Sequence, residues 1–465
     1  MWFISLVFKN LWHRKIRSIL TCTSMAVAVC AVLSMLGTAE GYEQSFAALY
    51  EARGTDLVIT QAGKAQRIAS NLDESLIGRI AKIPGVKAVE GTLVDLASFP
   101  EANVVYFFGL DPSSVLVEGS KIKEGRPLTA ADRRKVAIGR TLARNLGKKL
   151  GDSIEYLGEA FEVIAIFESY NLLESNGGVI PLKEMQEFLG KGKITTVIVI
   201  LNGDYKSPEK VAEVRKNIDA LRDPVPSEHV GYAVLQDIVE GENARKTVDD
   251  KGVERLVITE YKGGPEKKER LKPRIAIEDD QGKQLATYPL AVGATVAVRA
   301  KQKVDKGTVL AMKPLNIDAQ ATRDHISSNM ETQTMKGLAW ASSFIAMLIG
   351  FVSMLNTMMM SISERIREIA TFRAIGWRKH RIMQMIFMEA FLLSAIGALL
   401  GIALAVPLME FLANFSMTSS LVVSRITLET FFKGVGMGLF AGLLGAFYPA
   451  IIAANLSPAS ALRHE

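Results

Sequence analysis

The stretch LAWASSFIAMLIGFVSMLNTMMM, Leu338–Met360, contains 23 residues and no acidic or basic side chain. As an α-helix it would extend about 35 Å, enough to cross the roughly 30 Å hydrocarbon core of a bilayer. The next stretch, SISERIREIATFRAIGWRKHRIM, Ser361–Met383, has eight acidic and basic residues. A membrane-spanning helix is therefore predicted to end at Met360, where a charged segment in water begins.

Three other apolar runs of 18 residues or more occur, at Ile19–Leu36, Ala390–Met409 and Gly434–Ala454. The four runs together predict transmembrane helices within 19–38, 338–360, 384–410 and 431–455. The first run could instead be a secretory signal, because basic residues precede it and small residues follow it. The apolar core of a signal is normally about 7–15 residues long, so an uncleaved anchor is favoured.

The distribution of basic residues predicts the orientation of these helices. Basic residues flank the first span, separate the second from the third and follow the fourth: Lys9, Arg14, Lys15 and Arg17; Arg365, Arg367, Arg373, Arg378, Lys379 and Arg381; Arg463. Because such residues concentrate in cytoplasmic segments, 1–18, 361–383 and 456–465 are expected in the cytoplasm, and 39–337 and 411–430 outside. Both termini are then cytoplasmic, and the net charge of +6 reflects topology and not nucleic-acid binding.

The long outer region is predicted to contain two units. Residues 39–228 alternate short β-branched runs with short amphipathic stretches, typical of an α/β core domain. Residues 229–314 are rich in charge, glycine and short apolar runs, and predict a β-rich insert resembling a small barrel or sandwich. Residues 315–337 return to the core, and helical periodicity from Ile317 predicts a stalk helix into the second span. The fold class is an α+β membrane protein with four transmembrane helices and an α/β extracytoplasmic domain carrying this insert.

Sequence signatures of catalysis are absent. No GxxxxGK[ST] phosphate-binding loop and no GxSxG nucleophile motif occurs, and the five histidines are scattered. We therefore expect no catalytic residue, cofactor or metal site in this chain. A channel or proton-coupled carrier is disfavoured, because the spans place ionisable residues only near their edges, at Glu389 and Glu410.

Glycines in the third and fourth spans recur at the spacing that lets helices approach closely. They form one GxxxG and one double GxxxG, with Gly397 and Gly401 in the third span and Gly434, Gly438 and Gly442 in the fourth. We predict that these glycines pack against neighbouring helices.

The charged segment after the second span has two faces at helical spacing. Its apolar stripe contains Ile362, Ile366 and Ile369, and its polar face pairs Glu364 with Arg367 and Arg365 with Glu368. Gly376 is expected to end the helix. The residues alone leave two interpretations open: a helix lying among lipid headgroups, or a docking surface for a soluble partner.

A family resemblance favours docking. Met354–Met360, followed by Glu364-Arg365-x-Arg367-Glu368-Ile369 and Arg373-Ala374-Ile375-Gly376, closely resembles the FtsX-like permeases of ABC transporters, which include MacB-type macrolide exporters, lipoprotein-releasing complexes and the cell-division complex. Similar motifs lie at Arg53–Val58, Gly139–Ala143, Phe167–Ser169, Pro449-Ala450 and Ser457–Arg463. The resemblance covers about 1–228 and 315–465.

This resemblance implies a permease subunit of a bacterial inner membrane that works as a homodimer or heterodimer with a separate ABC ATPase, which binds ATP and Mg²⁺. It implies export or extraction of a lipid, lipoprotein, peptide or drug-like substrate, with a periplasmic adaptor as a further partner. It also implies that the surface contacting the ATPase consists of Glu364, Arg365, Arg367, Glu368, Arg373 and Gly376. Two alternatives are a non-transporting mechanotransmission subunit that regulates a periplasmic partner such as a cell-wall hydrolase, and a self-sufficient channel.

The insert resembles a different protein. Asp237–Gly241, Val253–Arg255 and Lys272–Asp279 look like an accessory barrel-sandwich region of the bacterial RNA polymerase beta-prime subunit. The metal-binding aspartate motif of that enzyme is absent, so no polymerase activity is implied. The segment is either a recruited β-module or a sign of a chimeric gene.

Overall fold

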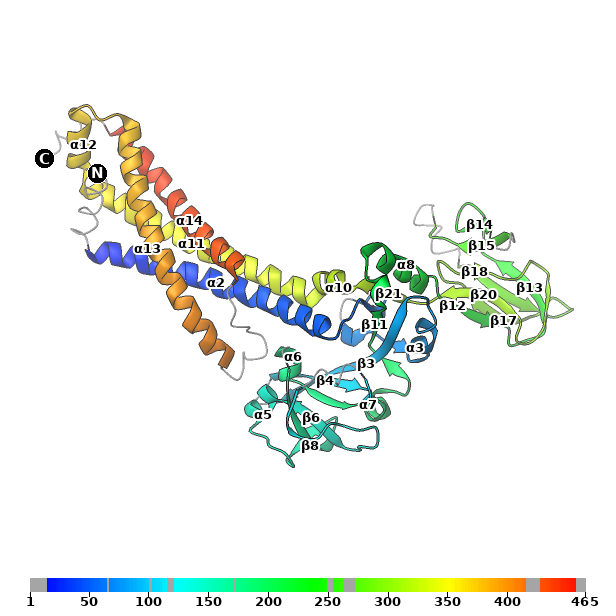
Figure 1. Cartoon of the computed structure of the whole chain (residues 1–465). Helices are drawn as coiled ribbons and strands as arrows, with labels where there is room; N and C mark the ends of the chain where they lie inside the picture. Colours follow the sequence, from blue (N-terminus) through cyan, green and yellow to red (C-terminus); the bar gives the residue numbers. More distant parts are fainter. Residues whose placement is uncertain are drawn as a thin grey trace.

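The molecule is elongated, with a helical bundle at one end and β-rich units at the other (Figure 1). The computed structural model describes residues 15–64, 67–99, 103–114, 121–169, 172–248, 254–261, 272–414 and 427–456. Four helices in these ranges are long and apolar enough to cross a membrane: α2 (Lys15–Ala52), α11 (Met330–Glu364), α13 (Lys379–Asn414) and α14 (Leu428–Asn455). The predicted four spans, with an α/β domain between the first and second, are confirmed.

Two of these helices continue beyond the membrane thickness as a stalk. Helix α2 has 38 residues, which corresponds to about 57 Å, nearly twice the hydrocarbon thickness. Its outer half buries the aromatic side chains of Tyr42, Phe46 and Tyr50 in a cluster with Ile326 of the short helix α10 (Thr322–Ser328) and with strand residues of the outer domain. This aromatic cluster fixes the stalk to the domain above it.

The part of the outer domain next to the stalk, here called lobe 1, is a sheet covered by helices. Its strand order is β21 (Ile317–Ala321), β1 (Leu57–Gln61), β11 (Thr196–Leu201) and the first half of β3 (Val86–Phe99). Lobe 1 also contains a small strand pair, two 3₁₀ helices and two α-helices. These are β2 (Leu72–Asp73) with β10 (Lys193–Ile194), η1 (Arg67–Ala69) and η2 (Gly203–Tyr205), and α3 (Ser75–Ile80) and α8 (Pro208–Asp219). The predicted stalk helix from Ile317 is wrong in its first five residues, because pairing with β1 makes them a strand. The rest is not continuous either, since the extended backbone of Asn329 separates α10 from α11.

The second part, lobe 2, continues the same sheet. Its strands are β4 (Asn103–Leu110), β9 (Gly178–Pro181), β6 (Lys135–Gly139), β8 (Glu159–Glu168) and β5 (Lys121–Gly125), with β7 (Ser153–Tyr156) paired to β8. Its helices are α5 (Arg140–Leu146), α6 (Leu172–Ser175) and α7 (Leu182–Leu189). Gly147 ends α5 at φ 63°, a left-handed conformation that suits glycine at a helix C-terminus.

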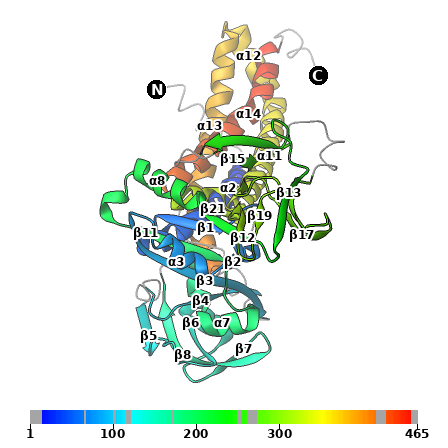
Figure 2. The ribbon, with the colours of Figure 1, turned by 90° about the vertical axis from the view of Figure 1, so that its right-hand side faces the viewer.

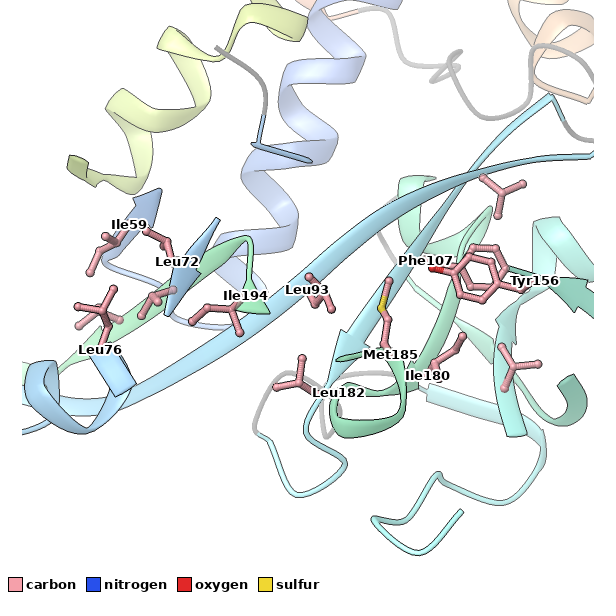
Figure 3. Packing of buried hydrophobic residues seen from close by; sticks show 14 of the residues in the cluster. Ile59, Leu72, Leu76, Leu93, Phe107, Tyr156, Ile180, Leu182, Met185 and Ile194 are labelled. Carbon is pink, nitrogen blue, oxygen red and sulfur yellow. The ribbon is translucent and has the colours of Figure 1, made fainter. Parts of the chain in front are cut away.

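Strand β3 joins the two lobes. Val86–Thr92 pairs with β11 in lobe 1, and Leu93–Phe99 pairs with β4 in lobe 2. One hydrophobic cluster runs along it, from Ile59 and Ile194 on the lobe 1 side, past Leu93, to residues of lobe 2 (Figure 3). Shared strand and shared core make relative motion of the lobes costly.

The β-rich insert is a sandwich of two sheets, as the sequence predicts (Figure 2). One sheet has the order β12, β20, β18, β15, β14, and the other has the order β17, β16, β13, β19. Their bounds are β12 (Arg222–Pro226), β13 (Gly231–Gln236), β14 (Ala244–Val248), β15 (Glu254–Ile258), β16 (Arg274–Glu278), β17 (Gln284–Pro289), β18 (Thr295–Val296), β19 (Lys303–Val304) and β20 (Val309–Pro314). The first strand begins at Arg222, before the predicted boundary at His229, and it tolerates Pro224 and Pro226 because it lies at a sheet edge.

The insert joins lobe 1 through two short connections. Strand β12 follows α8 closely, and only Leu315 and Asn316 separate β20 from β21. Across the junction, Arg79 of α3 donates to the Arg222 carbonyl at 2.8 Å and forms an ion pair with Asp223. The insert is therefore attached to lobe 1 between α8 and β21, the strand that leads toward the stalk.

The insert is expected to be dispensable for folding of the lobes. Arg222 and Pro314 are paired neighbours, and the hydrophobic cluster of the insert shares no residue with that of the lobes. Replacing Arg222–Pro314 in the full chain by a short Asn-Gly-containing linker should therefore shift the melting temperature of the lobes by less than about 4 °C.

Thermal unfolding of the detergent-solubilised chain and limited proteolysis of the lobes measure this. Ile218→Ala is the matched control, because it empties a fully buried position of α8 and should cost about 2–5 kcal/mol. An insert deletion as destabilising as Ile218→Ala would contradict the independence of the two cores.

Candidate coupling site at the base of the helix bundle

The base of the bundle is the end that carries Lys15, Glu364, Lys379 and Asn455, farthest from the lobes (Figure 1). Helix α11 ends there at Glu364, and Arg365 leaves helical geometry at φ −112° and ψ 16°. A separate helix α12, Ile366–Ala374, follows, and Gly376 at φ 102° turns the chain into α13. The predicted segment 361–383 is thus the last turn of α11, one short helix and the first turn of α13.

Helix α12 lies on the bundle through an apolar face. Ile369 and Ala370 are buried, and Ile369 belongs to a cluster with Ile362 of α11 and Ile382 and Ile386 of α13. Alanines at the end of α14 belong to the same cluster. Helix α12 therefore shares a hydrophobic cluster with the ends of three membrane helices.

The turn after α12 is packed by an aromatic pair. Phe372 stacks on Trp377 with ring centroids 4.8 Å apart. Arg373 donates through Nη1 to the Trp377 carbonyl oxygen at 3.1 Å, and is only partly exposed. Arg373 and the exposed Gly376 thus shape the turn into α13.

Arg365 points into the interior, where its guanidinium binds two carboxylates. Its Nη1 donates to Glu389 of α13 at 2.7 Å, and its Nε donates to Glu368 at 2.9 Å. Only 5% of Arg365 and 4% of Glu389 is exposed. The expectation that Arg365 lies on an exposed face is wrong. Arg365 comes three residues after the buried Ile362 and four before the buried Ile369, a spacing that puts it on the same side as these two residues.

Sequence reasoning missed the role of Glu389 as the partner of this arginine. The available signal was its place at the edge of a span, where a lone carboxylate is costly and usually has a partner. The partner could not be identified from spacing, since Arg365 and Glu389 lie 24 residues apart.

The exposed face of the base combines charge with an apolar side chain. Glu364, Arg367 and Glu368 are exposed, and Ile375 is 72% exposed at the end of α12. An exposed charged surface around an apolar anchor is suited to a protein partner, because the anchor supplies affinity and the charges supply specificity.

Polar contacts also tie the remaining helix ends together at the base. Arg17 of α2 donates to Glu364 of α11, with Nη1 3.0 Å from Oε2. Lys379 of α13 donates to the Asn455 side chain of α14 at 2.8 Å. Each of the four membrane helices therefore takes part in a side-chain contact at the base.

Glycines of α13 and α14 lie where these helices touch α2 or, at Gly442, where α14 touches α13. A Cβ added at Gly397 would lie 2.6 Å from the Met25 Cβ, and one at Gly401 2.7 Å from the Ala26 carbonyl oxygen. A Cβ added at Gly434 would lie 2.4 Å from Leu33 Cδ2, one at Gly438 2.5 Å from Val29 Cγ2, and one at Gly442 1.8 Å from Ser394 Oγ. Close packing at these five positions has no room for a side chain.

At the other end of the membrane region, α2 is bound to α14 by hydrogen bonds. The Glu40 carboxylate accepts from Thr427 Oγ1 at 3.0 Å and from Lys433 Nζ at 2.9 Å, and also from Thr430. The middle of each span carries no ionisable residue. The described residues contain no group of three or more His, Cys, Asp or Glu side chains placed to hold a metal ion.

Comparison with known families accounts for both halves of this architecture. The MacB-like periplasmic core domain matches residues 18–221, and the FtsX-like permease C-terminal domain matches residues 340–458. The chain is an FtsX/MacB-type ABC permease. The insert lies between the two matched ranges.

Individual relatives resemble parts of this permease. The macrolide export ATP-binding/permease protein MacB of Campylobacter jejuni (strain 81-176) is 34% identical over 140 residues, which are 30% of this chain and 21% of the relative. The MacB of Mannheimia succiniciproducens is 33% identical over 144 residues, 30% of this chain and 22% of the relative. The matched part is about a fifth of the length of these relatives.

Two solved structures are similar to part of this chain. The periplasmic region of MacB from Actinobacillus actinomycetemcomitans has a TM-score of 0.30 and 18% identity, covering 37% of this chain and 86% of that one. The extracellular domain of the transporter YknZ from Gram-positive bacteria has a TM-score of 0.29 and 18% identity, covering 36% and 90%.

Gly401 provides a test of the helix packing. In Gly401→Ala the added Cβ meets a backbone oxygen that cannot move without shifting α2, so the variant should lose about 1–3 kcal/mol of stability. Gly436→Ala is the matched control, because no atom lies within 4 Å of its added Cβ. Thermal unfolding in detergent compares the two, and equal melting temperatures would contradict the close contact between α13 and α2.

Proposed function

We propose that this chain couples ATP hydrolysis by a separate ATPase to movement of the outer domain, and so drives export or extraction of an amphiphilic or peptide substrate. The observation that carries the proposal is the continuity between the base and the lobes. Helix α12 packs on the membrane helices at one end. At the other end α2 leads into β1, and the neighbouring strand β21 leads through α10 into α11. Movement at the base has a short covalent path to the outer sheet.

The path to lobe 1 consists of two junctions. Helix α2 ends at Ala52 and β1 begins at Leu57, while β21 ends at Ala321 and α10 begins at the next residue. Strands β1 and β21 are antiparallel neighbours, paired from Leu57 with Ala321 to Gln61 with Ile317. Because the two strands are hydrogen-bonded together, a tilt of the two stalk helices turns the sheet as one unit.

The path to lobe 2 runs through a buried ion pair. Arg53, directly after α2, pairs with Glu174 of α6, and Ser169 Oγ donates to the same carboxylate at 2.7 Å. Both charged side chains are less than a tenth exposed. Separating them would leave an uncompensated buried charge, which costs several kcal/mol, so lobe 2 is held to the stalk end.

The family and the charge pattern support the remaining parts of the proposal. The relatives named above are ATP-binding/permease proteins, and a permease chain of this type needs an ATPase partner. The basic residues near the base favour a cytoplasmic base, and we propose that the lobes lie outside a bacterial inner membrane. We also propose a permease dimer and an adaptor on the outer side. Spans without ionisable residues in their middle do not support a proton-coupled path or an ion channel.

If the chain instead regulates an outer partner, the same path would carry the movement to that partner and not to a transported substrate. Export and regulation can be distinguished by identifying the protein that binds the lobes. An adaptor that increases substrate release from reconstituted vesicles supports export, and a cell-wall hydrolase that is activated only when ATP is hydrolysed supports regulation.

Charge reversal on the exposed face tests the coupling proposal. Arg367→Glu should weaken ATPase binding by about tenfold, because it places like charges together across the contact. Lys216→Glu is the matched control, since it makes the same charge change on an exposed face of α8 in lobe 1.

The measurement is co-purification with the ATPase encoded by its host, identified by mass spectrometry and by ATP hydrolysis, followed by titration of the purified pair. Retention of full affinity by Arg367→Glu, with Lys216→Glu unchanged, would remove α12 as the docking helix.

A further inference from the structure

The strongest feature outside the proposed docking face is the buried ion pair between Arg365 and Glu389. Arg365 is the single non-helical residue between α11 and α12, and Glu389 belongs to α13. The Nη1 to Oε1 distance is 2.7 Å, and both residues are at least 95% buried. The pair therefore joins the start of α12 to a different membrane helix from the one that precedes it.

Helix α12 also contacts the bundle through an apolar side chain. Ile369 packs against isoleucines of α11 and α13, and such contacts are non-directional, so they allow a short helix to slide or rotate. An arginine–carboxylate hydrogen bond fixes both distance and angle. Moving α12 away from α13 would also separate two charges inside a low-dielectric environment, which is far more costly than sliding.

We infer that the Arg365–Glu389 pair is a positioning device that holds α12 to α13, so that force applied to α12 is delivered to α13 as well as to α11. Arg365 is then a positioning residue and not a contact for the ATPase. The inference rests on the proposed function for its coupling readout only, since the position of α12 can be measured without any partner.

Glu368 supplies a natural comparison within the same site. It binds the same guanidinium at 2.9 Å, but its side chain is 59% exposed, whereas that of Glu389 is 5% exposed. Water replaces a lost contact at Glu368 and cannot do so at Glu389. The two carboxylates therefore differ in burial while sharing their partner.

The position of α12 is tested by distance measurement between spin labels. Labels are placed at Thr371→Cys on α12 and Gln384→Cys on α13, both exposed, in a full chain carrying Cys22→Ala and Cys30→Ala. In nanodiscs without ATPase, the parent chain and Glu368→Gln should give one narrow distance distribution. Glu389→Gln should give a broadened distribution with a second population.

A double variant separates positioning from simple stabilisation. Arg365→Met combined with Glu389→Leu removes both charges and leaves neither unpaired, so the chain should still fold, as its melting temperature will report. We expect a broadened label distribution and, in the complex with the ATPase, at least a fivefold loss of ATP-dependent coupling at unchanged melting temperature.

Three results of these experiments would contradict the positioning role of the Arg365–Glu389 pair or the proposed function. A narrow distribution with full coupling in the double variant would show that the pair only fills space. A loss of ATPase binding as large as the loss of coupling would assign Arg365 to the docking surface instead. Failure to find any ATPase partner would remove the proposed function and leave the label distances as an independent result.

Discussion

The antiparallel pairing of β1 with β21 is the contact on which the rest of the molecule depends. It joins Leu57–Gln61 to Ile317–Ala321, two segments separated by nearly the whole outer region. On one side of this pair the chain becomes the two stalk helices, and on the other side it becomes the lobes and the insert. Without it, α2 and α11 would end at separate places and motion of the bundle would have no common sheet to turn.

The membrane half could be predicted from sequence because its signals are local. A span must satisfy its own backbone hydrogen bonds within one segment, so an apolar run such as Leu338–Met360 predicts its helix without knowledge of its neighbours. The same holds for the turn at Gly376, whose positive φ favours glycine. Gly397 and Gly401 lie at close helix contacts for an equally local reason, since small side chains permit close approach.

The features that sequence reasoning missed depend on distant partners. Arg365 lies at helical spacing from the buried Ile362 and Ile369, but its partner Glu389 belongs to another helix, and no spacing rule connects the two residues. Ile317–Ala321 has a helical pattern and becomes a strand because β1 is available to pair with it. Arg222–Pro226 has two prolines, and only its edge position beside β20 makes it a strand.

The arrangement of contacts along the bundle determines what kind of motion it can carry. Directional polar contacts lie at its two ends, at Arg17–Glu364 and Arg365–Glu389 near the base and at Glu40–Lys433 near the lobes. Between them the helices meet mostly through glycines and apolar side chains, with hydrogen bonds of Thr21 to Thr357 (3.0 Å) and of Ser24 with Ser353 (2.6 Å) between α2 and α11. Under the proposed coupling, a bundle held together in this way is expected to tilt as a unit when its base is pushed. Because only two residues join the insert to β21, the same proposal predicts that the insert follows the tilt of lobe 1.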